Sequence, residues 1–216
     1  MIHPDEIQST SFAIIEREMG AHTLPPEEFL IVRRVIHSTG DFEYARLLRC
    51  HPQAFTAAAA AIRAGEDVLT DVEMVRMGIH ALAARRHGLR VRCHLNDPEV
   101  AEEARRARIT RSAQGVVQGL RRGSVGICVI GNAPTALRAV LKLCRTGEVT
   151  PPRLIVGVPV GFVDAAESKQ ALGATDAVPW ITFLGRKGGS AVAAAIVNAL
   201  LEWVPARCVA WEAGDG

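Results

Sequence analysis

Short apolar runs alternate with helix-like segments over the last two thirds of the chain, and this alternation constrains the fold most strongly. Each run has the length of a strand and is followed by polar or glycine residues; the five runs cover 67–70, 89–95, 124–130, 153–158 and 180–184. Strands that alternate with helices form a parallel sheet with helices on both faces. The pattern therefore predicts a three-layer α/β/α fold around a mostly parallel five-stranded sheet.

The amino-terminal third has a different pattern. Residues 1–65 show helical apolar spacing throughout, and a third helix is expected from Asp41 to Leu48. We therefore expect an extra N-terminal helical segment within a single domain that spans residues 1–204. Residues 205–216 are expected to form a flexible tail.

Composition excludes several classes of partner. A formal net charge of +2 over 216 residues is too small to indicate a nucleic-acid partner or an anionic membrane surface. The sequence shows neither a signal-peptide pattern nor an apolar run long enough to cross a bilayer, so we expect a cytoplasmic protein. Lysine occurs only at positions 142, 169 and 187, and such an arginine bias suits an anionic small molecule. A GC-rich genome would produce the same bias.

Cysteine and histidine do not form a recognisable metal site. The five cysteines are scattered without a C-x-x-C pair, which argues against both a disulfide framework and structural zinc. His80, His87 and His94 are seven residues apart, but no H-E-x-x-H motif accompanies them. We therefore predict no metal site.

Glycine and polar residues gather where the predicted strands end. In parallel sheets, ligands bind at the carboxyl ends of the strands, so we expect the site at these loops. The turn Gly131–Thr135 can offer backbone N–H groups to an anion, and Gly185–Ser190 contains two cations, Arg186 and Lys187. Neither loop fits G-x-G-x-x-G or the P-loop, so a nucleotide-dependent enzyme is a minor alternative.

His37 lies where a predicted helix breaks into Ser-Thr-Gly-Asp. Imidazole exchanges protons near neutral pH, so His37 is a candidate acid or base, although it could also simply complement the helix dipole. Ser11 lies close to the apolar stripe of the first predicted helix, where a hydroxyl is unexpected. It could bond back to a carbonyl one turn earlier or serve a site.

Eight stretches occur in order between about Ile7 and Leu201, and these are Ser11–Ile15, Val35–Asp41, Thr70–Val75, Thr110–Ser112, Ile130–Leu137, Gly157–Val163, Ala166–Lys169 and Gly185–Ser190. Together they resemble the precorrin-8X methylmutase and cobalt-precorrin-8 methylmutase family. Gly-Asn-Ala-Pro-Thr-Ala-Leu and Pro-Val-Gly-Phe-Val followed by Glu-Ser-Lys are highly specific in combination.

The resemblance implies an isomerase of cobalamin biosynthesis. It would move a methyl group from C-11 to C-12 of the corrin ring of precorrin-8X or cobalt-precorrin-8, giving hydrogenobyrinate or cobyrinate. It further implies a homodimer with the site at or near the subunit interface and no cofactor. A corrinoid carrier that binds product without turnover is the alternative.

The resemblance also assigns residues. It implies that His37 is the catalytic acid or base, that Ser11 contacts the substrate, and that Arg111 lies near the substrate carboxylates. Further contacts are expected from position in the matching motifs, and these residues are Thr110, Asn132, Thr135, Lys169, Arg186 and Lys187.

Overall fold

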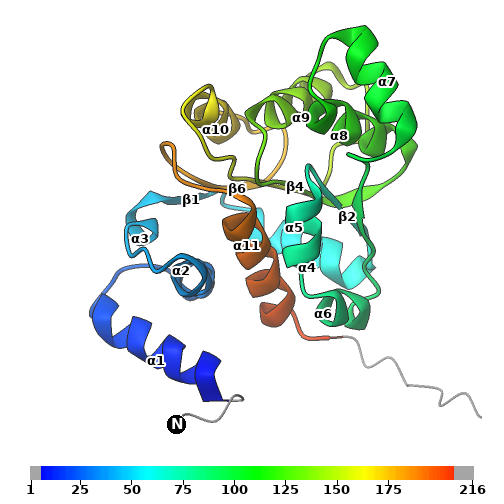
Figure 1. The fold of residues 1–216 in the computed structure, drawn as a ribbon. Coiled ribbons are helices and arrows are strands. Elements are labelled where there is room, and N and C mark those ends of the chain that lie inside the picture. The colour runs from blue at the N-terminus through cyan, green and yellow to red at the C-terminus, as the bar shows by residue number, and fades with distance from the viewer. Residues whose placement is uncertain (1–5, 207–216) are drawn as a thin grey trace, which may run out of the picture.

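The computed structural model describes residues 6–206, and within them six strands form one sheet (Figure 1). The strand order is β1-β6-β5-β4-β2-β3. All neighbours are parallel except β1, which runs antiparallel to β6 at one edge. The strands are β1 Leu48–Cys50, β2 Asp67–Thr70, β3 Val91–Cys93, β4 Val125–Ile130, β5 Leu154–Gly157 and β6 Trp180–Phe183.

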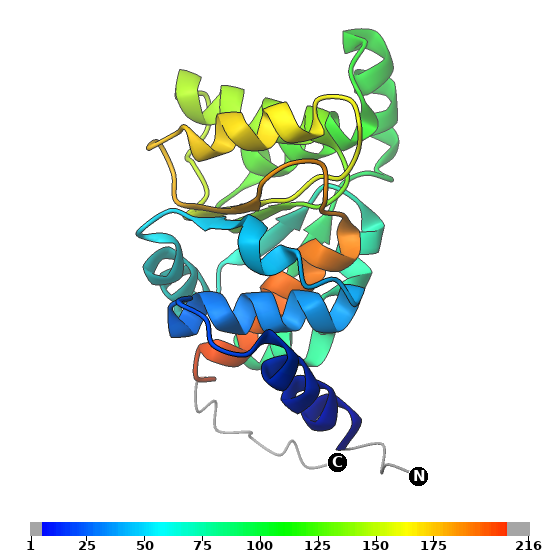
Figure 2. The same cartoon turned by 90° about the vertical axis from the view of Figure 1, so that its left-hand side faces the viewer.

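Helices cover both faces of this sheet, as Figure 1 shows. One layer consists of α7 Pro98–Ala107, α8 Arg111–Arg122, α9 Pro134–Thr146 and α10 Ala165–Gly173. The opposite layer contains α2 Pro26–Thr39, α4 Ala54–Ala64, α5 Glu73–Gly78, α6 Ala81–Arg86 and α11 Ser190–Trp203. Two further helices precede the sheet, α1 Ile7–Met19 and α3 Tyr44–Leu47. Figure 2 shows that α1 lies outside α2, which packs on α11.

The mostly parallel α/β architecture predicted from the sequence is confirmed, with one correction. The sheet has six strands rather than five, because Leu48–Cys50 forms β1 and does not extend a helix. Residues 1–65 are therefore not helical throughout. The strand exists through its pairing with β6, in which Leu48 faces Phe183 and Cys50 faces Ile181. Residues 207–216 of the expected tail lie outside the described part of the chain.

Alternation along the strands divides the core in two. On β4, Ile127 and Val129 face the layer of α2, α4 and α11, whereas Cys128 and Ile130 face α8, α9 and α10. With both faces buried, the loops at the carboxyl ends of the parallel strands are where functional side chains can gather. No helix within residues 6–206 is long and apolar enough to cross a membrane.

Candidate active site

His37 and Ser11 form a hydrogen-bonded pair between α2 and α1. The hydroxyl oxygen of Ser11 lies 2.8 Å from Nδ1 of His37, and the Phe12 ring contacts the imidazole edge-on at 5.3 Å between centroids. His37 is exposed, and no hydrogen bond to its Nε2 is found among residues 6–206. Because Ser11 orients one nitrogen and leaves the other open, the ring can exchange a proton with a ligand at Nε2.

The end of α2 determines where His37 lies. Gly40 ends the helix in a left-handed conformation (φ 68°), which glycine adopts without strain, and its N–H donates to the Ile36 carbonyl oxygen at 2.7 Å. Val35 and Ile36 are buried against the core, so the last turn is held from inside while His37 projects outward. A dipole contact at the helix end and a role in proton transfer are therefore compatible.

An apolar cavity of about 360 Å³ adjoins the imidazole. Ile7, Ile14 and Phe42 line it and remain partly exposed, by 54%, 39% and 36% respectively. Exposed apolar walls around a titratable ring suit a flat, largely apolar ligand. Sequence reasoning identified His37 and Ser11 here, but it missed these walls and Phe12.

The turn after β4 differs from the sequence expectation. The buried Asp71 carboxylate accepts hydrogen bonds from the backbone N–H groups of Gly131, Asn132 and Ala133 at 3.0, 2.9 and 2.8 Å. Burial raises the pKa of the Asp71 carboxyl, and these three donors counteract that rise. The N–H groups predicted to receive an external anion are already occupied, so that expectation is wrong. Asn132 itself is exposed at this edge.

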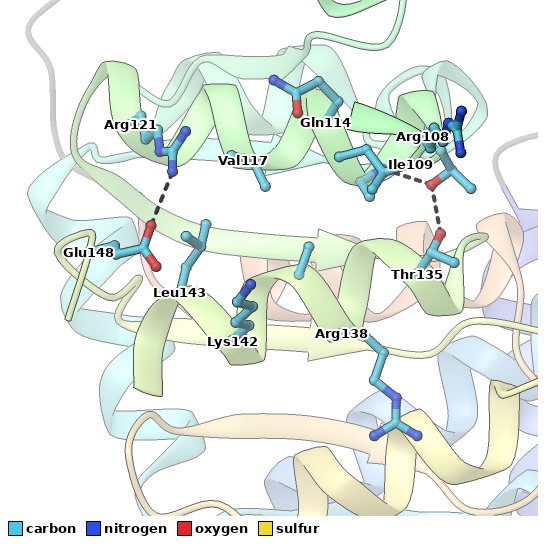
Figure 3. A pocket seen from close by; sticks show the side chains of 13 residues that line it. Arg108, Ile109, Gln114, Val117, Arg121, Thr135, Arg138, Lys142, Leu143 and Glu148 are labelled. Atoms are coloured by element: carbon cyan, nitrogen blue, oxygen red, sulfur yellow. Dashed lines mark hydrogen bonds and ion pairs between the residues drawn. The ribbon is translucent and has the colours of Figure 1, made fainter. Parts of the chain in front are cut away.

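Thr110 and Thr135 meet farther along the carboxyl ends of the strands, and Arg111 follows Thr110 in the chain. The two threonine hydroxyls lie 2.7 Å apart, and Thr110 also caps α8 by accepting from the Ala113 N–H (Figure 3). Arg111 donates to the Leu95 carbonyl oxygen at 2.7 Å. This anchors an otherwise exposed guanidinium beside the end of β3.

A groove of about 610 Å³ starts at the two threonines and runs between α8 and α9 (Figure 3). Its cations are Arg108, Arg121, Arg138 and Lys142. Arg121 pairs with Glu148 at 3.1 Å and Arg138 pairs with Asp164, while no ion pair is found for Arg108 or Lys142 within residues 6–206. Sequence reasoning missed this groove, although Arg138 and Lys142 have the spacing of neighbours on one helix face.

The cations near Gly185–Ser190 are placed very differently from one another. Lys169 is fully buried, donates to the Lys187 carbonyl oxygen at 2.6 Å, and has its pKa lowered to about 8 by desolvation. The Lys187 ammonium contacts the carboxylates of Asp41 and Glu43, just after α2. Arg186 is exposed, with its guanidinium carbon 5.3 Å from the centre of the Phe162 ring.

The predicted residues form an extended row rather than one cluster. Ser11 meets His37, and Thr110 meets Thr135, but His37 and Arg111 lie toward opposite ends of the sheet edge. The strands β6, β5, β4, β2 and β3 separate those ends by four spacings, or about 19 Å at ~4.8 Å each. Residues 6–206 contain no cluster of His, Cys, Asp and Glu fit to hold a metal ion.

The protein is a layered α/β protein, and its polar and charged candidate residues follow the carboxyl ends of the parallel strands. The family model described as precorrin-8X methylmutase matches residues 6–203. A cobalt-precorrin-8 methylmutase from Priestia megaterium is 43% identical over 199 residues, covering 92% of this chain and 88% of the relative. A precorrin-8X methylmutase from Pseudomonas aeruginosa is 41% identical over 197 residues, covering 90% and 93%.

A solved structure is similar as well. The precorrin-8X methyl mutase from Thermus thermophilus superimposes with a TM-score of 0.84 at 39% identity, covering 92% of this chain and 95% of the other. The chain therefore belongs to the precorrin-8X methylmutase family, a family of isomerases. The family resemblance seen in the sequence motifs is confirmed.

Proposed function

We propose that this chain converts precorrin-8X or cobalt-precorrin-8 by moving a methyl group from C-11 to C-12 of the corrin ring, with His37 as the general acid. The bond between the methyl carbon and C-11 breaks as a bond to C-12 forms, so atoms and electrons balance within one molecule. The observation that carries the proposal is the 2.8 Å contact between Ser11 and His37 beside an apolar cavity. It provides an oriented proton donor where a flat macrocycle can lie.

Proton transfer from Nε2 to a ring nitrogen would assist the shift, and the ring would return one proton to the imidazole after the methyl group has moved, because substrate and product are isomers. A proton on a ring nitrogen draws electron density out of the conjugated path and lowers the barrier to methyl migration. Ser11 would accept from the Nδ1–H of the charged imidazole and hold Nε2 toward the ligand. Arg111 and Arg186 would bind acetate and propionate carboxylates, for which guanidinium is well suited.

His37→Ala tests this assignment directly. We expect turnover to fall by at least about 100-fold, the usual range for loss of a general acid, while the affinity for the corrinoid product stays within about threefold. His80→Ala is the matched control, because His80 is exposed and its hydrogen bonds among the described residues involve only its backbone N–H and carbonyl groups. Conversion of excess ligand distinguishes an enzyme from a carrier, which changes the spectrum only in proportion to protein.

Both metal-free and cobalt-containing substrates should be assayed, since the relatives include methylmutases named for each. Near-normal turnover of either by His37→Ala would refute the general-acid role.

We further propose that two copies associate through the side of the molecule where the carboxyl ends of the parallel strands lie. Phe162 and Val163, in the loop after β5, are 84% and 85% exposed, and Met74 and Met77 on α5 are each 72% exposed. Exposed large apolar side chains favour an interface. A second copy could also supply basic groups near His37, because within one chain Arg111 lies beside β3, four strand spacings from β6.

A further inference from the structure

We propose that Lys187 positions the turn after His37, whereas the adjacent Arg186 contacts the substrate carboxylates. This inference rests on the proposed function, because it divides the two loop cations of the candidate site between two roles. It replaces the expectation from the sequence motifs that both cations bind substrate.

The charge around Lys187 argues against substrate binding. Its ammonium lies against Asp41 and within 2.5 Å of a Glu43 carboxylate oxygen, so one positive charge faces two negative ones. These contacts lower the pKa of Asp41 and raise that of Lys187. A locally anionic cluster repels the carboxylates of a polyanionic corrinoid. No such pairing is found for Arg186 among the described residues, and its charge remains available.

The two carboxylates belong to the unit that carries His37. Asp41 follows the helix-ending Gly40, and its Oδ1 also accepts the Glu43 N–H at 2.9 Å. The last turn of α2, its glycine cap and this turn are thus continuous through hydrogen bonds. The contacts of Lys187 with Asp41 and Glu43 therefore influence the position of the helix end that carries His37.

On the other side of the contact, the loop that carries Lys187 is hydrogen-bonded to neighbouring elements. The Lys187 carbonyl oxygen accepts from buried Lys169 at 2.6 Å, and the Gly189 N–H donates to the Val158 carbonyl oxygen at 2.9 Å. Gly188 packs so closely that an added Cβ would lie 2.2 Å from the Val158 oxygen. These contacts hold the loop against the residues that follow β5, and from there the Lys187 side chain extends to the turn after His37.

The two roles make opposite predictions for the double variant Asp41→Asn/Glu43→Gln. Asparagine keeps the oxygen that accepts the Glu43 N–H, so the change removes charge and little else. If Lys187 positions the turn, this variant and Lys187→Met should each lower kcat at least about tenfold with KM within about twofold. If Lys187 binds substrate, freeing it from the carboxylates should lower KM and leave kcat unchanged.

Three further variants complete the kinetic test. Lys187→Arg should retain kcat within about threefold, because guanidinium can bridge the same carboxylates. The triple variant Asp41→Asn/Glu43→Gln/Lys187→Met should be no slower than Lys187→Met, because Lys187→Met alone already removes the contact with both carboxylates. Arg186→Met should raise KM at least about fivefold with kcat retained. An increase of KM alone in Lys187→Met, or an equal loss of kcat in Arg186→Met, would overturn the proposal.

A second measurement does not depend on turnover. The ¹H–¹³C signal of the His37 ring, assigned by its loss in His37→Gln, should shift in Lys187→Met and in the double variant but not in Arg186→Met. An unchanged His37 signal in folded Lys187→Met would also refute the positioning role. If the wild-type protein converts neither substrate, the proposed function fails, while the His37 signal still decides the role of Lys187.

Discussion

Asp71→Asn should reveal how much the turn after β4 depends on one buried carboxylate. In the native protein Oδ1 accepts from Gly131, and Oδ2 accepts from both Asn132 and Ala133. An asparagine oxygen can replace Oδ2 and retain two of these bonds in neutral form. Its amide then faces the Gly131 N–H, which leaves one buried donor opposed to another.

The magnitude follows from these three contacts. A hydrogen bond to a charged group contributes about 1.5–3 kcal/mol, and an unsatisfied buried donor costs a further ~1–3 kcal/mol. Since two bonds survive in weaker form, we expect the free energy of unfolding to fall by about 2–4 kcal/mol. For a chain of this size, that corresponds to roughly 5–15 °C in Tm. Asp71→Ala should destabilise more, because all three donors lose their acceptor.

Thermal and urea unfolding measure the loss, and Asp176→Asn is the control, since Asp176 is exposed and we find no contact of its carboxylate. The folded fraction of Asp71→Asn should also show a lower kcat/KM, because Asn132 and Thr135 follow from the turn. A Tm within about 1 °C of wild type would refute the reasoning. It would mean that the carboxyl is protonated in the native protein, or that the turn holds its shape without it.

Three other measurements test separate parts of the structure. Burial lowers the pKa of Lys169 to about 8 from 10.5, so the folded chain binds fewer protons than the unfolded chain between these values. The free energy of unfolding of wild type minus Lys169→Met should therefore rise with pH across that window, by at most about 3 kcal/mol; a flat difference would contradict it. Burial raises the pKa of the Cys50 and Cys128 thiols, which makes the free energy of unfolding fall at high pH, but this effect is common to both proteins and cancels in the difference. Ser11→Ala should lower kcat about tenfold with KM nearly unchanged, and full activity would remove Ser11 from the mechanism. Light scattering at micromolar concentration should give twice the chain mass, and Phe162→Asp should give a monomer; a monomeric wild type would exclude a shared site.

The sequence predicted the elements whose signals are local. Strands β2 and β4 are continuous apolar runs followed by turns, and both were expected close to their observed bounds. Strand β1 was missed because three residues carry no periodicity, and its identity depends on pairing with β6, far away in the chain. The strand propensity of three residues does not predict the distant strand with which they pair.

The same distinction holds in the candidate site. His37 and Ser11 were named separately, but they are 26 residues apart, and their contact depends on how α1 packs on α2. Asp71 lies 60 residues from Gly131, and only the adjacency of β2 and β4 brings its carboxylate to that turn. The sequence motifs predict which residues belong to the site, whereas the hydrogen-bond partner of each residue depends on how the helices and strands pack.

The distribution of charge along the sheet edge indicates how a corrinoid would lie there. The backbone N–H groups of the turn after β4 already donate to Asp71, and Lys187 is already paired with Asp41 and Glu43. Neither these N–H groups nor Lys187 can bind an external carboxylate without losing an internal one. Arg186 and Arg111 remain available to external carboxylates, while the cavity beside His37 is apolar. We therefore expect a ligand with a flat apolar ring and peripheral carboxylates to place its ring in the cavity beside His37 and its carboxylates against the available guanidinium groups of one or both copies.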